Sequence, residues 1–227
     1  MRTRGLVIFD AFNTLVTSRP GYQGTFLAGL TAVNEHASAD LLTTLNAASE
    51  GLDHSDWSTS RQVYSEWTVR TLASLAQAGA ALDRELASRV VPALEQLHQA
   101  PMAALPDAAD CLARLKDAGF SLAVCSNWSW DLGADLAGTG LVRWIDVLVT
   151  SAQIGYRKPH PRIYQATLDQ AGFGAADAVF VGDSLRTDAL GPQRAGIRSV
   201  LLARDAEEQI HPEQVASLGD AARLLLG

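Results

Sequence analysis

Lysine is scarce in this chain. Only Lys116 and Lys158 occur among 227 residues, and all other residues of permanent positive charge are arginines. Acidic residues outnumber Lys and Arg by 25 to 18, which gives a formal net charge of −7 at pH 7. Nucleic acids and anionic membranes bind proteins through clustered lysine and arginine side chains. The charge balance therefore predicts that neither is a partner.

Cysteine is also rare, and no apolar run is long. Cys111 and Cys125 share no metal-ligand or redox spacing, so we expect two reduced thiols in the core. No apolar run approaches the roughly 18 residues of a membrane-spanning helix. The basic N-terminus "MRTRG" leads into only four apolar residues, too few for the core of a signal peptide. We therefore expect a soluble, cytoplasmic protein.

What the chain does have is ample apolar material, 48% of its residues, in three stretches of different texture. The continuous run "GLVIFD" at residues 5–10 predicts a buried strand of the parallel type. Residues 22–98 are rich in Ala, Leu and Gln with apolar spacing near three and four, which predicts helices and no strand. From about residue 101, short apolar strands alternate with helical patterns, as in βαβ units.

The alternation after residue 101 defines the expected core. The predicted strands are "FSLAVCSN" (120–127), "WIDVLVTS" (144–151), "AVFVGDS" (178–184) and "IRSVLLA" (197–203). The predicted helices are "PDAADCLARLKDAG" (106–119), "PRIYQATLDQAG" (161–172), "DALGPQRAG" (188–196) and, as one or two helices, "PEQVASLGDAARLLLG" (212–227). We therefore expect an α/β fold, a Rossmann-like parallel sheet flanked by helices, with an inserted all-helical cap domain. Residues 1–16 and 99–227 would form the catalytic core, and residues 17–98 the cap.

Polar residues follow three of the predicted strands. Asp10, Ser126 and Asp183 each stand where an apolar run ends. In open parallel sheets, ligands bind at the carboxyl ends of the strands. The sequence thus predicts an active site that contains these three side chains.

Four separated segments fit one pattern. They are "FDAFNTL" (9–15), "CSN" (125–127), "RKPHPRIY" (157–164) and "VGDSLRTD" (181–188). Together, and in this order, they resemble the haloacid dehalogenase-like (HAD) hydrolase superfamily, in members with a helical cap inserted after the first strand. The resemblance covers the whole chain.

The resemblance implies a nucleophile and a metal site. Asp10 would attack the substrate and form a covalent aspartyl intermediate. The carboxylates of Asp10 and Asp183, with the backbone carbonyl of Phe12, would hold Mg²⁺. Thr14 would form a hydrogen bond near the nucleophile.

It also implies how the transferred group is held. Ser126 and the backbone of Asn127 would bind its oxygens, and Lys158 would neutralise negative charge on nucleophile and substrate. Asp188 would orient Lys158 or support the metal. The residue chemistry agrees, because a carboxylate that attacks a phosphate needs a cation and a hard metal to offset like-charge repulsion. Trp128 and Trp130 flank the Ser126 loop. Each could pack in the core or contact the substrate, and substrate contact is considered above all for Trp128.

Position 12 departs from the phosphatase pattern. Family phosphatases usually carry there a second aspartate that protonates the leaving group, and Phe12 cannot do this. The 2-haloacid dehalogenases have an aromatic residue at this position, and the segment with Lys158 and Tyr164 also resembles theirs. They use no metal, however, whereas "GDSLRTD" has the metal-binding form. Phosphonatases need a cap lysine, and residues 17–98 contain none.

A phosphohydrolase that takes its acid from the cap, or needs none, is the remaining subclass. Candidate acids are His36, His54 and Glu66, and a slow enzyme would also fit, since general acid catalysis contributes about 10²- to 10⁴-fold. Arg19, Arg61 and Arg70 could meet an anionic substrate or simply lie on the surface.

We therefore expect a Mg²⁺-dependent phosphohydrolase that acts on a small phosphorylated metabolite. A metal-free 2-haloacid dehalogenase, or other C–X hydrolase, is the first alternative. A weakly active or inactive protein that binds a phosphorylated ligand is the second. The sequence predicts no particular oligomeric state.

Overall fold

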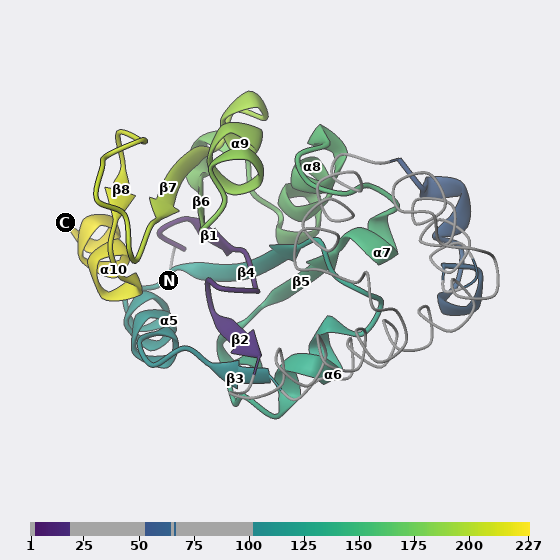
Figure 1. Cartoon of the computed structure of the whole chain (residues 1–227), viewed down its shortest axis with the longest axis horizontal. Coiled ribbons are helices and arrows are strands. Elements are labelled where there is room, and N and C mark those ends of the chain that lie inside the picture. The colour runs from purple at the N-terminus through teal and green to yellow at the C-terminus, as the bar shows by residue number, and fades with distance from the viewer. Residues whose placement is uncertain (1–2, 19–52, 65, 67–101) are drawn as a thin grey trace, which may run out of the picture.

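The computed structural model describes residues 3–18, 53–64, 66 and 102–227 (Figure 1). Most of the predicted cap, including His36, Arg19 and Arg70, lies outside these residues. The division into core and cap is therefore still a prediction. Within the described ranges, no helix is both long and apolar enough to cross a lipid bilayer.

The core is a six-stranded parallel sheet of order β5-β4-β1-β6-β7-β8. Its strands are β1 (Leu6–Phe9), β4 (Ser121–Ser126), β5 (Val147–Thr150), β6 (Ala178–Gly182), β7 (Arg198–Leu202) and β8 (Gln214–Val215). All four residues of β1 are buried, as expected of a continuously apolar strand covered on both faces. The predicted α/β fold is confirmed.

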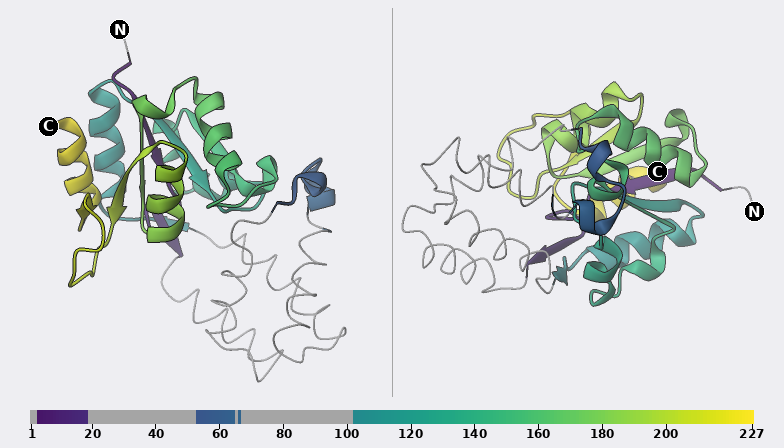
Figure 2. Two further views of the ribbon diagram at one scale, coloured as in Figure 1. Left: turned by 90° about the horizontal axis from the view of Figure 1, so that it is seen from above. Right: turned by 90° about the vertical axis from the view of Figure 1, so that its right-hand side faces the viewer.

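Helices cover both faces of this sheet, and the side chains of β1 alternate between two cores. Val7 and Phe9 belong to a cluster with the buried faces of α5 (Ala108–Asp117) and α10 (Leu218–Leu226). Leu6 and Ile8 belong to a second cluster with α8 (Pro161–Ala171). Figure 2 shows α5 and α10 on one side of the sheet and α8 on the other. The sheet is therefore a buried middle layer, and ligands can reach its strands only at their ends.

Shorter helical segments occupy the connections between strands. They are η1 (Ser55–Trp57), α6 (Leu132–Ala137), η2 (Val142–Trp144), α7 (Ser151–Ile154), η3 (Ala175–Asp177), the π-helical η4 (Leu185–Leu190) and α9 (Gly191–Arg194). The single helix predicted over residues 188–196 is thus divided between η4 and α9. The helix predicted over 161–172 is confirmed: it begins with Pro161 and stops at Gly172, whose φ of 73° ends the helix in the left-handed region.

The C-terminal prediction is wrong in its first half. Residues Gln214–Val215 form β8, which pairs with Leu201 and Leu202 at the edge of β7. The helix begins only at Leu218, where the Ser217 hydroxyl accepts a hydrogen bond of 3.0 Å from Asp220 N. Pairing with an open strand edge satisfies the backbone of β8, which explains why the apolar spacing before residue 218 does not form a helix.

A two-stranded ribbon joins the ends of the insertion. β2 (Val16–Ser18) pairs antiparallel with β3 (Met102–Ala104), so the chain leaves and re-enters the core side by side. The ribbon crosses the boundary that the sequence suggested after residue 16. Strands of three residues carry no readable pattern, and this pair was not foreseen.

The two cysteines lie in the core. Cys111 and Cys125 are free and fully buried, as predicted, and burial raises the pKa of their thiols to about 12 and about 11.

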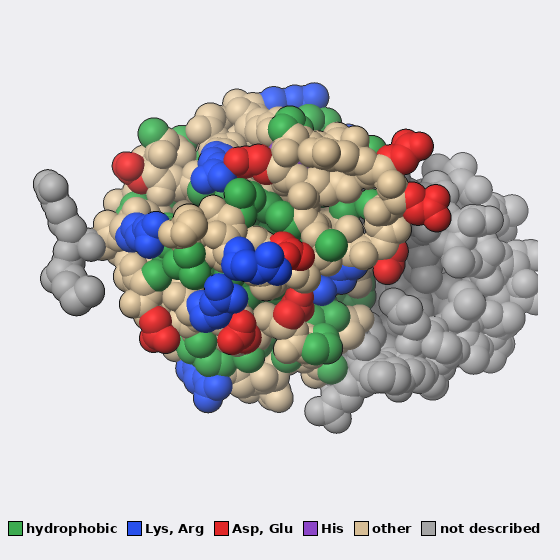
Figure 3. All heavy atoms as spheres, turned by 90° about the vertical axis from the view of Figure 1, so that its left-hand side faces the viewer, with side chains coloured by type: hydrophobic (Ala, Val, Ile, Leu, Met, Phe, Trp, Pro, Cys, Tyr) green, Lys and Arg blue, Asp and Glu red, His purple; other side chains and the backbone are tan. Residues whose placement is uncertain are grey.

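On the face drawn in Figure 3, acidic and basic side chains are interspersed. Arg204 forms an ion pair of 2.9 Å with Asp107, and the same carboxylate accepts a hydrogen bond from Leu218 N. This contact ties the start of α10 to the start of α5.

Candidate active site

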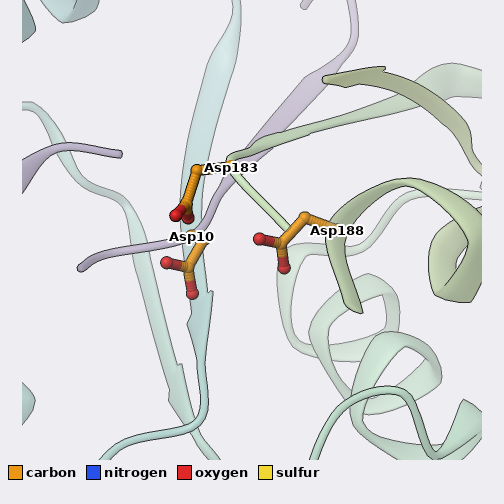
Figure 4. Close-up of side chains that lie close together, drawn as sticks. All are labelled: Asp10, Asp183 and Asp188. Carbon is orange, nitrogen blue, oxygen red and sulfur yellow. The ribbon is translucent and has the colours of Figure 1, made fainter. Parts of the chain in front are cut away.

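Three carboxylates lie together beyond the carboxyl ends of the central strands β1 and β6. Asp10 follows β1, and its backbone N–H donates to Val181 O at 3.0 Å, which aligns it with the end of β6. Asp183 follows β6 directly, and Asp188 lies on η4. Figure 4 shows the three side chains converging. One oxygen from each lies within 4.8 Å of the others.

This cluster is electrostatically costly without a cation. Asp10 and Asp188 are buried, and Asp183 is open to solvent. Partial loss of water and the charges of Asp10 and Asp188 raise the pKa of Asp183 to about 6. Oxygen ligands of this kind are what Mg²⁺ and Ca²⁺ prefer, so the donor set fits a hard divalent ion.

Lys158 joins two of these carboxylates. Its Nζ lies 2.6 Å from Asp10 Oδ1 and 2.6 Å from Asp188 Oδ1, and its side chain is 2% exposed. Burial alone would lower the pKa of this amine, but the two carboxylates more than offset that effect and raise it. A permanently charged ammonium thus lies beside Asp10.

Hydroxyl groups complete the arrangement around the carboxylates. Ser126 Oγ, at the end of β4, donates to Asp10 Oδ1 at 2.9 Å. Thr14 Oγ1 donates to Asp183 Oδ1 at 3.2 Å, so its hydrogen bond is to one of the expected metal ligands, next to Asp10. The side-chain amide of Asn127 bonds to the backbone of Lys158, with Oδ1 accepting from its N–H and Nδ2 donating to its carbonyl.

Five residues predicted from four separate segments of the sequence therefore meet in one place: Asp10, Ser126, Lys158, Asp183 and Asp188. A match to the family model described as "haloacid dehalogenase-like hydrolase" extends over residues 5–196. The chain belongs to this family of hydrolases. The resemblance read from the four segments is confirmed.

Named relatives of this HAD-like hydrolase include both phosphatases and a dehalogenase. Human haloacid dehalogenase-like hydrolase domain-containing protein 3 is 36% identical over 121 residues, 51% of this chain and 48% of that protein. Glyceraldehyde 3-phosphate phosphatase of Methanopyrus kandleri is 30% identical over 139 residues, 61% of this chain and 60% of the relative. (S)-2-haloacid dehalogenase 4A of Burkholderia cepacia is 33% identical over 130 residues, 55% of this chain and 56% of the relative. The chain spans about half the length of the curated relatives it matches.

An aromatic pair occupies the place of the missing acid in this HAD-like hydrolase. Phe12 is half-buried, and its ring centroid lies 6.3 Å from that of Trp128. Trp128 is only 8% exposed and donates from Nε1 to Asp135 Oδ2 at 2.7 Å. Position 12, two residues after Asp10, thus carries an apolar side chain that packs against Trp128 and supplies no proton.

One described segment of the insertion lies against the core. His54 N–H donates to Gly155 O at 2.6 Å, and Asp53 bridges to Tyr156. Burial, and then the charge of Arg157, lowers the pKa of His54 to about 4. The neutral form of its imidazole is therefore favoured at pH 7.

The other candidates from the described part of the insertion are exposed. Glu66 accepts a hydrogen bond from Gln62, and Arg61 forms an ion pair with Asp131. Tyr64 stacks at a tilt against Trp130, with 6.3 Å between ring centroids. Trp130 therefore contacts the insertion, while Trp128 packs in the core.

Residues that orient Asp188 were not foreseen. Ser184 N donates to Asp188 Oδ2 at 3.0 Å, and Thr187 Oγ1 donates to Oδ1 at 3.1 Å. Tyr164 Oη donates to the carbonyl of Thr187 at 2.6 Å. At Gly182, an added Cβ would lie 2.5 Å from Asp188 Cβ, so only glycine fits. The glycine before Asp183 was the one sequence signal for this close approach.

Proposed function

We propose that this HAD-like hydrolase is a Mg²⁺-dependent phosphohydrolase that acts on a small phosphorylated metabolite. The observation that carries the proposal is the approach of three carboxylate oxygens to within 4.8 Å, with the Lys158 ammonium on two of the side chains. Such a site is built to receive both a divalent cation and an anion. The phosphatases among the relatives support this choice.

The expected ligands of the ion are the carboxylates of Asp10 and Asp183 and the backbone carbonyl of Phe12. Asp188 is a weaker candidate, because its two oxygens already accept from Lys158, Thr187 and Ser184. When bound, Mg²⁺ would offset the negative charge of phosphate and carboxylates. The Thr14 hydroxyl would orient Asp183 for this task.

Asp10 is the proposed nucleophile. Its carboxylate oxygen would attack phosphorus, and the bond between phosphorus and the ester oxygen would break as the leaving group departs as an oxyanion, which then takes a proton from water. Water would then hydrolyse the aspartyl phosphate and regenerate Asp10 with release of inorganic phosphate. Lys158 and Ser126 both contact Asp10 Oδ1, and they would hold the carboxylate in line and stabilise charge on the transferred group. The backbone N–H of Asn127 would bind one oxygen of the transferred phosphoryl group.

The leaving group must depart with little help from the core. Phe12 has no proton to give, and the low pKa of His54 argues against that histidine, one of the candidate acids, as a donor. We therefore propose a substrate whose leaving oxygen is a weak base, such as a phenol or an enol. Residues 17–98 are proposed to form the cap that closes over the substrate. The Phe12–Trp128 pair would contact its apolar part.

A metal-free dehalogenase is the second candidate, and Phe12 is the observation that favours it. An aromatic residue at this position resembles the 2-haloacid dehalogenases, because halide leaves without a proton. A dehalogenase is also among the relatives. Against it stands the triple carboxylate cluster, because among the described residues Lys158 pairs with Asp10 and Asp188 only, and a metal-free site would leave Asp183 without a cation.

Assays with phosphate esters and 2-haloacids, each with Mg²⁺ and with EDTA, test the proposal. We expect turnover of phosphate esters that EDTA abolishes. Asp10→Asn should lower kcat by at least about 10³-fold, as loss of a nucleophile does in other hydrolases, while circular dichroism shows an unchanged fold. Haloacid turnover that survives EDTA would favour the second candidate. Full activity of Asp10→Asn would overturn both.

A further inference from the structure

The side chain of Asn127 is engaged by Lys158 and not turned toward a substrate. Its Oδ1 accepts from Lys158 N at 2.6 Å, and its Nδ2 donates to Lys158 O at 3.0 Å. A primary amide is the side chain that offers one acceptor and one donor side by side, as this ring of two bonds requires. We propose that Asn127 is a positioning residue for Lys158, an inference that rests on the proposed function because that function gives Lys158 its role.

Lys158 needs such a support because it does not lie on a strand. It follows Tyr156 and Arg157 in the loop between α7 and α8, whereas Asp10 directly follows β1. No sheet register therefore fixes its backbone. The hydrogen bonds from Asn127 connect this loop to the end of β4, which pairs directly with β1.

The position of the Lys158 backbone decides where its ammonium lies. The side chain is buried, and Nζ lies 5.2 Å from the centre of the Phe180 ring. Nζ must also reach two carboxylate oxygens at 2.6 Å. A shift of the backbone by about 1 Å would lengthen one of these contacts, and misplacement of that size can cost about 10²-fold in rate.

Adjacent residues thus act on the two partners of one ion pair. Ser126 Oγ bonds to Asp10 Oδ1, while Asn127 bonds to the backbone of Lys158. The end of β4 therefore sets the distance between the nucleophile and the ammonium. Asn127 would act through Lys158, and only its backbone N–H would face the substrate.

The two roles of Asn127 predict different kinetics. A side chain that positions Lys158 affects charge stabilisation in the transition state, so its loss should lower kcat. A side chain that binds the substrate should, when lost, mainly raise KM. We expect Asn127→Ala to lower kcat by about 10- to 100-fold and to leave KM within about threefold.

The scarcity of lysine supplies a direct structural readout. With carbon-13 at lysine Cε, the protein should give two resonances, one for each lysine, and Lys116→Arg assigns them. We expect Asn127→Ala to move the Lys158 resonance and leave that of Lys116 unchanged. Gln165→Ala is the matched control, because Gln165 also carries a hydrogen-bonded amide, to Asp169, but lies exposed on α8. It should move neither resonance and leave kcat unchanged.

Asn127→Asp covers the case in which the alanine variant does not fold. It keeps the size and the acceptor for Lys158 N but loses the donor to Lys158 O, so the Lys158 resonance should again move. An unmoved resonance in a folded variant overturns the proposal, and so does a change in KM alone. If the resonance moves but the wild type hydrolyses no phosphate ester, positioning of Lys158 stands and the proposed function fails.

Discussion

Lys158 and Asp188 form an ion pair with Nζ and Oδ1 2.6 Å apart, and their side chains are only 2% and 1% exposed. A pair so well removed from water depends on both partners. If one is lost, the other is left as an uncompensated buried charge. Here the loss of Lys158 would also leave Asp10 facing Asp188 without a cation between them.

The first prediction concerns this pair. Lys158→Met should lower the free energy of unfolding by about 3–5 kcal/mol, the cost of breaking a buried ion pair. Lys116→Met is the control, because Lys116 pairs with Asp146 at 2.8 Å on the surface, where such pairs contribute at most about 1 kcal/mol. Urea unfolding measures both. Similar losses for the two variants would contradict the buried pair.

The second prediction is that Mg²⁺ reverses the order of the melting temperatures of the wild type and Asp183→Asn. Without Mg²⁺, Asp183→Asn should raise the melting temperature, since it removes a charge that its surroundings disfavour strongly enough to raise its pKa to about 6. With Mg²⁺ at about 100 times its Kd, the wild type should gain about 2.7 kcal/mol, and the variant much less. The wild type should then melt about 5–10 °C higher than in EDTA.

Differential scanning calorimetry in EDTA and in Mg²⁺ tests the reversal. Asp169→Asn is the matched control, because it removes an exposed carboxylate on α8 that contacts only Gln165 among the described residues. It should respond to Mg²⁺ as the wild type does. An equal Mg²⁺ response of Asp183→Asn would remove Asp183 from the metal site.

The sequence predicted those parts of the fold and site in which a local pattern determines the outcome. β1 is a continuous apolar run that ends at Asp10, so its burial and its polar end are both readable. The strand of residues 178–182 and Asp183 follow the same logic. The parallel arrangement of such strands then brings their ends together, and this is why Asp10, Ser126 and Asp183 could be grouped from the sequence.

Features decided by distant partners were not predicted. Val16 and Ala104 pair across the insertion, and no local pattern announces a ribbon of three residues a strand. Gln214 lies in a stretch with helical spacing, but the free edge of β7 makes it part of a strand. The contact of Asn127 with Lys158 depends on the conformation of a loop 31 residues away, which local propensity does not encode.

The third prediction is a pH dependence due to His54. Its pKa is about 4 in the folded protein and about 6.5 in an unfolded chain, so the unfolded state binds more protons between these values. The neutral His54 ring therefore makes its full contribution to the free energy of unfolding above about pH 6.5. As the pH falls towards 4, this contribution is lost, by up to about 3 kcal/mol. We expect the difference in free energy of unfolding between the wild type and His54→Gln, measured from pH 4 to 8, to change between pH 4 and pH 6.5. A constant difference would contradict it.

The fourth prediction follows from the aromatic residue at position 12. Because Phe12 donates no proton, a leaving group must depart as a weak base. The rate of hydrolysis of aryl phosphates should therefore rise steeply as the pKa of the leaving phenol falls, and alkyl phosphates should be poor substrates. Single-turnover measurements at saturating Mg²⁺ isolate the chemical step. His54→Gln is the control, and it should leave this dependence unchanged because the imidazole is already neutral at pH 7.

Phe12→Asp should restore part of the missing proton transfer. The carboxyl would replace a half-buried ring two residues after Asp10, whose centroid lies 6.3 Å from that of Trp128. We expect it to reach an ester oxygen bonded to the attacked phosphorus. Alkyl phosphates should gain most, by up to about 10²-fold, and the leaving-group dependence should flatten. Phe12→Leu is the matched variant, because it removes the ring without adding an acid and should leave the dependence steep. A wild type that hydrolyses aryl and alkyl phosphates at similar rates would mean that an acid from the insertion already serves the site, and Phe12→Asp would then gain nothing.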